Sequence, residues 1–500
     1  MSAYAQLEKS FHRLANIEGA TAILDWDWAV IMPKGSAESR SNQLSELSLI
    51  RYEILADPKL GDLLCDAEAK KEHLDDWQRA NLKEMRHNWM HANSMQPDLI
   101  VALNQTTSKC EMLWREARKN NDFKSFSKGF RPLLKLIREK AEAKSAVFKM
   151  PLYDVLMDEY DPGITTRDID KHFSDLQLFL PSLLDEIIDR QGNQTVPIMP
   201  KGPFNLIKQK ELSLKLMEKI GFNFDSGRLD ESHHPFCGGV PGDVRITTKY
   251  DEDDFTSSMM AVLHETGHAL YERGLPKDWR HQPVGKAPSM SLHESQSLLL
   301  EMQVCRSREF FSFASPLIKT LLSNTKSKCL LRFDPENLYR LAIRVAPGPI
   351  RIYADEVTYP LHVMLRYHLE KEMIEGGIQV NDLPDAWEQW MNDLLGVMPK
   401  NHGEGCLQDI HWATGEIGYF PSYTLGALIA AQIFEKVERE IKQVKSDIAI
   451  GDFSSLMSWL LESVHSQGSC YSTQDLVERV TGRPLDTRAF EVHLRTRYLS

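Results

Sequence analysis

The sequence lacks the features that mark membrane, secreted and nucleic-acid-binding proteins. Its longest hydrophobic run, around residues 425–434 of 500, is too short to cross a bilayer. Residues 1–13 mix charged and apolar side chains without a continuous apolar core, which argues against a secretory signal. The 59 basic residues are outnumbered by 71 acidic ones, for a net charge of −12. We therefore expect neither nucleic acid nor a membrane as a partner.

Cysteine is sparse and follows no pairing pattern. The seven cysteines are scattered, odd in number, and form no C-x-x-C pair. A disulfide framework does not fit this pattern, so we expect reduced thiols and a cytoplasmic location.

Strand-forming sequence is also scarce. Only residues 222–250 combine clustered glycines with an alternating β-branched run at 244–250, which predicts a small β-hairpin or sheet. Elsewhere apolar residues recur at helical spacing, most clearly in the N-terminal helical region, residues 1–150. No change in composition suggests a linker. We predict a mainly α fold, with residues 1–500 forming one large helical domain with a long substrate groove.

Several helix boundaries can be predicted from local signals. Residues 1–60 favour two helices around a break that contains residues 23–28 and 32–35. Pro97 and residues 120–122 separate long amphipathic helices, and a further helix is expected from Thr166 to Arg190.

One pattern carries chemistry: His264, Glu265 and His268 form the sequence H-E-x-x-H. On a helix, residues i and i+4 lie one above the other on the same face, so two imidazoles there can bind one metal ion. Glu265 would then act as general base toward the attacking water.

The surroundings of this pattern favour a helix. Thr256 and Ser257 are the predicted cap at its start, after an acidic run, and Gly274 and Pro276 are expected to end it. Because the flanking residues are mostly apolar, both histidines should lie inside a buried helix.

A catalytic zinc ion usually has three protein ligands. A second helix is predicted from Ser291 to about Phe313, and Glu294 at its start is the preferred third ligand. Glu301, two turns later on roughly the same face, is the alternative. Leu298 stands where thermolysin-like enzymes have an aspartate, and no spaced Gly and His follow His268, so the site is best described as His, His, Glu.

Beyond these residues, the chain resembles the carboxypeptidase Taq family of metallopeptidases over nearly its whole length. The similar segments occur in the same order: Leu24-Asp25-Trp26-Asp27 with Met32-Pro33, His234-Pro235-Phe236, Asp243-Val244-Arg245-Ile246-Thr247, His264-Glu265-Thr266-Gly267-His268, His293-Glu294-Ser295, Ile350-Arg351-Ile352-Tyr353-Ala354-Asp355, and Gly405-Cys406-Leu407-Gln408-Asp409-Ile410-His411-Trp412.

The resemblance implies a helical fold with a deep groove, a homodimer, and a metal-dependent carboxypeptidase of broad specificity. By position it implies that His264, His268 and Glu294 hold the metal and that Glu265 is the base. It also implies that Arg351 and residues 409–412, beginning with Asp409, line the substrate site.

The chemistry of the remaining residues agrees with this interpretation. A guanidinium can bind a free α-carboxylate with two parallel hydrogen bonds, and Arg351 is the preferred candidate, with Arg245 and Arg344 as alternatives. The plain interpretation of Arg351 is an ion pair with Asp355 or Glu356, which follow it closely in the sequence.

The tetrahedral intermediate needs a hydrogen-bond donor besides the metal. Tyr423 and His411 are candidates, followed by Tyr419, although each could equally be structural. His234 either contacts substrate or is a turn residue before Pro235.

We therefore place the metal and substrate site within residues 255–425 and predict metal-assisted hydrolysis of C-terminal peptide bonds. A metallo-oligopeptidase or endopeptidase with the same metal site is the alternative. One divalent ion per subunit is expected: the ligands suit Zn²⁺, and Co²⁺ and Mn²⁺ bind similar sites.

Overall fold

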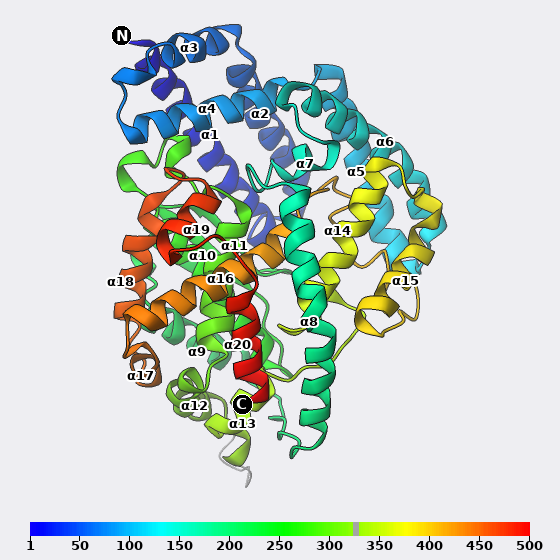
Figure 1. Ribbon diagram of the computed structural model, residues 1–500, viewed down its shortest axis with the longest axis vertical. Coiled ribbons are helices and arrows are strands. Elements are labelled where there is room, and N and C mark those ends of the chain that lie inside the picture. The colour runs from blue at the N-terminus through cyan, green and yellow to red at the C-terminus, as the bar shows by residue number, and fades with distance from the viewer. Residues whose placement is uncertain (324–329) are drawn as a thin grey trace.

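The computed structural model describes residues 1–323 and 330–500, and helices dominate it (Figure 1). At the N-terminus, four helices enclose a small apolar core of their own: α1 (Ala3–Val30), α2 (Ala37–Ala56), α3 (Pro58–Glu68) and α4 (Asp76–Asn93). They lie together at the top of the view, in blue.

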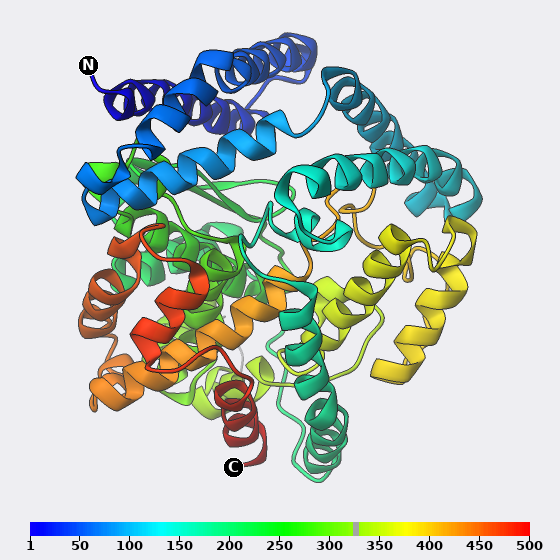
Figure 2. The same ribbon diagram turned by 45° about the horizontal axis from the view of Figure 1, so that its top comes forward.

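The two large hydrophobic cores lie on opposite sides of one helix, α16 (Pro421–Glu440). Leu425 and Leu428 of α16 contribute to one core, and Ile429 and Ile433 contribute to the other. A helix that is apolar on all sides in this way is expected only in a protein interior. Figure 2 shows α16 in orange, running toward the centre of the molecule between the yellow and the red helices.

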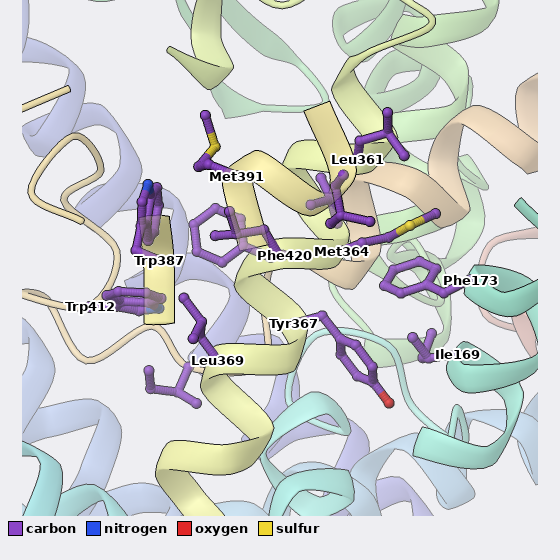
Figure 3. Packing of buried hydrophobic residues seen from close by; sticks show 14 of the residues in the cluster. Ile169, Phe173, Leu361, Met364, Tyr367, Leu369, Trp387, Met391, Trp412 and Phe420 are labelled. Carbon is purple, nitrogen blue, oxygen red and sulfur yellow. The ribbon is translucent and has the colours of Figure 1, made fainter. Parts of the chain in front are cut away.

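The first large core is built by helices from distant parts of the chain: α5 (Pro97–Asn120), α6 (Phe123–Phe148), α7 (Leu152–Met157), α8 (Thr166–Gly192), α14 (Tyr359–Glu375), α15 (Leu383–Leu395) and α20 (Arg488–Leu499). Figure 3 shows part of it, where Met364 and Tyr367 of α14 face Phe173 of α8, and Trp387 of α15 lies near Trp412.

The second large core is built by α9 (Leu206–Ile220), α10 (Phe255–Gly274), α11 (Met290–Leu298), a π-helical segment η6 (Leu299–Cys305), α12 (Arg308–Leu322), α13 (Pro335–Ala342), α17 (Val444–Ala449), α18 (Ser454–Ser463) and α19 (Thr473–Thr481). Short 3₁₀ turns connect many of these elements: η1 (Lys34–Ser36), η2 (Lys71–His73), η3 (Phe224–Ser226), η4 (Lys277–Trp279), η5 (Pro283–Gly285), η7 (Leu330–Phe333), η8 (Arg351–Tyr353), η9 (Val380–Asp382) and η10 (His465–Gln467).

The predicted β region forms one small sheet of three strands, β1 (Gly227–Glu231), β2 (Phe236–Val240) and β3 (Asp243–Thr248). The strand order is β1-β3-β2, with β1 parallel and β2 antiparallel to β3. Apolar residues of the sheet and of α10 form a separate small core, so the sheet lies directly beside the H-E-x-x-H helix.

The mainly α prediction and the small sheet are confirmed, and α4, α5, α6 and α8 lie where the sequence predicts them. Residues 23–28 were wrongly placed in a break: they belong to α1, which ends only at Val30, because proline first occurs at Pro33. Trp26 is buried there beneath Arg245, whose guanidinium lies 4.3 Å from the ring centroid. The groove and the single-domain organisation stay predictions.

Two helix predictions near the H-E-x-x-H pattern are also corrected. Asp254, rather than Thr256 or Ser257, caps α10: its carboxylate accepts hydrogen bonds from both of their backbone amides, at 2.8 and 3.4 Å. The helix predicted from Ser291 to Phe313 is divided by η6, whose wider turns allow Glu301 to point back toward α10.

The described part of the chain has no helix with an apolar stretch long enough to cross a membrane.

Helices α10, α11 and α16 approach closely at two glycines. A methyl group at Gly267 of α10 would lie 2.6 Å from Cα of Ser297 and 2.7 Å from the carbonyl oxygen of Gln296. A methyl group at Gly426 of α16 would lie 2.8 Å from Cγ of Glu294. At both glycines, atoms of the neighbouring helix occupy the space that a side chain would need, so only glycine fits.

We predict that Gly267→Ala destabilises the protein by about 1–3 kcal/mol, because overpacking against backbone atoms forces the two helices apart. Urea unfolding followed by circular dichroism measures the change. Gly192→Ala is the matched control, since Gly192 is exposed at the end of α8 with no atom within 4 Å of the added methyl group. Equal stability of Gly267→Ala and Gly192→Ala would contradict the close-packing account.

Candidate metal centre and substrate site

Helix α10 presents its two histidines on one face. His264 and His268 are one turn apart, with ring centroids 4.9 Å apart. Both are partly exposed in an otherwise buried stretch, in which Leu263 and Ala269 have no exposed surface. The apolar side of the helix packs in the cores, so the imidazoles face α11.

Helix α11 carries Glu294 to this face. Its start is fixed by Ser289, whose hydroxyl accepts from the amide of Leu292 at 3.1 Å, and by Asp161, which accepts from the amide of Ser291 at 2.9 Å. Oε2 of Glu294 lies 3.4 Å from Nε2 of His268 and 3.9 Å from Nε2 of His264. One ligand atom of each residue lies within 4.8 Å of the others.

Glu301, the alternative third ligand, lies on the other side of His264. Its Oε2 is 3.0 Å from Nδ1 of His264, and its Oε1 accepts from Nη2 of Arg306 at 2.7 Å. Nδ1–H of His264 therefore donates to Glu301, which leaves Nε2 free to face Glu294. This is the contact that orients a metal-binding histidine in many metal sites.

His268 is oriented by a comparable chain of hydrogen bonds. Its Nδ1 lies 2.7 Å from Nδ1 of His293, and Nε2 of His293 lies 2.8 Å from Oε1 of Glu272. In the arrangement that satisfies every group, His268 donates to His293 and His293 donates to Glu272. Both histidines of the pattern thus present Nε2 to Glu294 while Nδ1 donates its proton elsewhere.

Charge is concentrated at this centre. Burial raises the pKa of Glu265 to about 7, against the opposing effect of His264. Burial alone would lower the pKa of His264, but Glu294 and Glu301 outweigh it and raise that pKa to about 10. Burial lowers the pKa of His268 to about 4. The two imidazoles lie beside three carboxylates, of which Glu265 and Glu301 are buried and Glu294 is partly exposed, and a cation stabilises such an environment.

The donor set fits a divalent transition metal. Two imidazole nitrogens and one carboxylate are typical ligands of catalytic zinc, and both imidazoles have a supporting hydrogen bond. His264, His268 and Glu294 are the residues that would hold such an ion.

Arg351 is buried in a second polar cluster. Its Nε and Nη2 donate to Oδ1 of Asp409 at 3.1 and 2.8 Å, and Nη1 donates to the hydroxyl of Tyr359 at 2.7 Å. Arg366 donates from Nε to the other oxygen of Asp409 at 2.7 Å. Burial opposes ionisation of Asp409, but Arg366 and Arg351 hold its pKa well below its usual range.

Three tyrosines pack together beside Arg351. Tyr359 and Tyr423 pack with ring centroids 6.0 Å apart, and Tyr419 packs on Tyr423 at 5.2 Å. The guanidinium carbon of Arg351 lies 5.2 Å from the ring centroid of Tyr423. Burial raises the pKa of the Tyr423 hydroxyl well above its ordinary value. Arg351 therefore lies against an aromatic wall.

His411 joins this wall. Its Nε2 lies 3.4 Å from the hydroxyl of Tyr423, and burial lowers its pKa to about 4, so the imidazole is neutral. Nδ1 of His411 is buried without a hydrogen-bond partner in the described part of the chain.

Three other sequence candidates lie outside these clusters. His234 is exposed in the β1–β2 turn, where its backbone carbonyl accepts from Thr247 at 3.2 Å and its imidazole, among the described residues, is free to contact other groups. Arg245 pairs with Asp243 at 2.6 Å and covers Trp26. Arg344 is exposed after α13.

Several residues at the site were missed by sequence reasoning. Glu272 follows His268 by one helical turn, a spacing that could have suggested it. Tyr359, Arg306 and Arg366 had no such signal, because each reaches its partner only through tertiary packing.

Comparison with known proteins assigns the chain to a family. Residues 6–498 match the model described as "Carboxypeptidase Taq (M32) metallopeptidase". The chain is 36% identical to thermostable carboxypeptidase 1 of Thermus thermophilus, covering 99% of this chain and 98% of that protein. It is 33% identical to thermostable carboxypeptidase 1 of Pyrococcus furiosus, with the same coverage.

Solved structures give the same result. Metallocarboxypeptidase 1 of Trypanosoma cruzi superimposes with a TM-score of 0.97 at 38% identity, covering 100% of this chain and 99% of that one. A Pyrococcus furiosus carboxypeptidase superimposes with a TM-score of 0.94 at 33% identity, covering 100% and 99%. The chain therefore belongs to the carboxypeptidase Taq (M32) family of metallopeptidases, and it is a metallocarboxypeptidase.

Proposed function

We propose that this enzyme removes C-terminal residues from peptides with broad specificity, and that His264, His268 and Glu294 hold one zinc ion per subunit. The observation that carries the proposal is the convergence of both Nε2 atoms on Oε2 of Glu294, with each Nδ1 held by a second group. Imidazole and carboxylate ligands suit zinc, and cobalt and manganese are the alternatives to be tested.

Glu265 is the proposed general base. When bound, the ion supplies a Lewis acid that polarises the scissile carbonyl and acidifies water. Glu265 lies between the two histidines in sequence, is 8% exposed and has a raised pKa, which suits both accepting and returning a proton. It takes the proton from the attacking water and delivers it to the leaving amine.

Arg351 is the proposed anchor for the substrate's α-carboxylate. Three of its five N–H groups donate to Asp409 and Tyr359, which leaves two without a partner in the part of the chain described. Arg351, Arg366 and Asp409 together carry one net positive charge, on a chain whose total is −12. Asp409 thus orients the guanidinium without cancelling its attraction for an anion.

The remaining candidates are assigned around this anchor. Tyr423 and His411 are the proposed donors to the developing oxyanion, supported by their contact with each other and their common environment. We retain His234 and Arg245 as substrate contacts outside the centre, with Tyr419 as the alternative donor.

Assembly and location complete the proposal. We infer a homodimer from the family resemblance, which sedimentation equilibrium tests directly. We also infer a cytoplasmic enzyme, in keeping with six free cysteines and no disulfide in the described residues.

The activity is tested by incubating the zinc-loaded enzyme with a long unblocked peptide and following the products by mass spectrometry. A ladder shortened only from the C-terminus, and abolished by a chelator, is expected. Internal fragments would instead support the oligopeptidase alternative.

We predict that Glu265→Gln retains zinc but loses most hydrolysis, with kcat lowered by at least about a hundredfold, because a positioned base contributes about 10²–10⁴. Elemental analysis and turnover are measured on the same sample. His264→Ala is the control for loss through the metal and should lose the zinc ion of the catalytic centre together with activity. Near-normal turnover by zinc-loaded Glu265→Gln would exclude Glu265 as the base.

We predict that Glu294→Ala abolishes zinc binding at the catalytic centre, whereas Glu301→Ala weakens binding at that centre by only about 10–100-fold. The reason is that Glu294 faces Nε2 of both histidines and Glu301 supports Nδ1 of His264 alone. Competition with a chromophoric chelator gives both dissociation constants. The ligand assignment fails if Glu301→Ala proves the more damaging.

We predict that Arg351→Ala lowers kcat/KM for a free-acid peptide by at least about ten- to a hundredfold, since each charge-assisted hydrogen bond contributes about 1.5–3 kcal/mol. A C-terminally amidated peptide should lose far less. Arg344→Ala, at an exposed arginine seven residues earlier, is the control and should match wild type. Equal losses on acid and amide would make Arg351 structural.

A further inference from the structure

A second group of metal-binding side chains lies in the N-terminal part of the structure. His87 and His91 are one turn apart on α4, and Asp158 directly follows α7. Oδ2 of Asp158 lies 2.7 Å from Nε2 of His87 and 3.0 Å from Nε2 of His91, and the two Nε2 atoms are 3.2 Å apart. Three candidate ligand atoms thus form a compact triangle.

The triangle is slightly smaller than the ligand triangle of a zinc site, so a bound ion would move the three side chains slightly apart. With metal–ligand bonds of about 2.0–2.1 Å, a tetrahedral zinc ion holds its ligand atoms about 3.3 Å apart. The corresponding distances at the catalytic centre are 3.4 and 3.9 Å, so this group is the more contracted of the two. The same i, i+4 spacing of histidines and the same third-carboxylate arrangement occur in both places.

Protons alone satisfy this group incompletely. If both Nε2 atoms donate to Oδ2 of Asp158, their N–H groups converge on one oxygen and face each other across 3.2 Å. A cation that replaces both protons removes this repulsion. The other carboxylate oxygen accepts from the amide of Gly163 at 2.9 Å, which fixes the orientation of Asp158.

A further carboxylate is close by. Glu84 lies one turn before His87 on α4, and it makes no hydrogen bond or ion pair within the described residues. Burial raises its pKa, against the opposing effects of His87 and Lys83. Glu84 would supply additional negative charge to a bound cation.

We propose that His87, His91 and Asp158 bind a second divalent transition-metal ion of the zinc class, separate from the ion of the catalytic centre.

The charged side chain of Lys144 opposes the binding of this ion. Its Nζ lies 2.8 Å from Nδ1 of His91 and 2.9 Å from Oε1 of Glu159. A charged ammonium can only donate a hydrogen bond. A histidine that binds a metal through Nε2 carries its proton on Nδ1, so Nδ1 of His91 could then no longer accept from Lys144. Metal binding therefore requires the Lys144 ammonium to turn entirely to Glu159.

The position of the site suggests a structural consequence. Residues 160 and 161 continue directly from Asp158 and hold the start of α11: the carbonyl of Tyr160 accepts from Met290 at 2.8 Å, and Asp161 accepts from Ser291 at 2.9 Å. An ion bound by α4 and Asp158 would tie the N-terminal helices to the segment that supports the helix of Glu294. It should therefore raise the unfolding temperature.

The test removes the catalytic ligands first. In His264→Ala/His268→Ala, we expect calorimetry and elemental analysis to find one zinc per chain, with a zinc-dependent rise in unfolding temperature. Adding His87→Ala or the more conservative His87→Gln should abolish both signals. Adding His281→Ala should preserve them: the His281 ring packs at a tilt on His12, with ring centroids 4.4 Å apart, and His281 belongs to neither three-ligand group.

Lys144→Gln provides a second measurement, because the amide oxygen can accept from Nδ1–H of His91. We expect zinc to bind about ten times more tightly to this variant in the same background. No zinc in His264→Ala/His268→Ala, zinc retained after both His87 substitutions, or unchanged affinity in Lys144→Gln would overturn the proposal.

Discussion

The close packing of α10 on α11 is the constraint on which the catalytic centre depends. Each helix alone carries only part of the proposed ligand set: two histidines on one, a glutamate on the other. The two parts meet because Gly267 allows the backbone of α11 to approach where a side chain would stand, and because Gly426 allows α16 to pack against Glu294. The two glycines therefore set the positions of the proposed ligands relative to one another.

The charges around the site between α10 and α11 then determine which ions and charged groups it can bind. The negative charge gathered around His264 and His268 is unfavourable in a buried place unless a cation balances it. At Arg351 and Arg366, two positive charges exceed the single negative charge of Asp409. The proposal that Arg351 anchors the substrate's C-terminus depends on this excess of positive charge.

Most of the successful predictions came from local sequence signals, although the break predicted at residues 23–28 was wrong. H-E-x-x-H spacing predicted a helix with two histidines on one face, and clustered glycines with a β-branched run predicted the small sheet. Sequence reasoning failed where tertiary packing decides. Nothing local indicates that residues 299–305 form a π-helical segment that points Glu301 to His264, or that Arg351 is held by Asp409 and Tyr359. Asp254 was missed as the α10 cap because two other good capping residues follow it.

The central claim is that the spacing between α10 and α11, and not the mere presence of three ligands, sets the affinity for the metal. The most direct measurement is the zinc dissociation constant of Gly267→Ala, obtained by chelator competition under conditions where the variant remains folded. All three ligands are retained in this variant, yet we predict zinc binding at least about ten times weaker than in wild type. A dissociation constant equal to that of wild type would contradict the account.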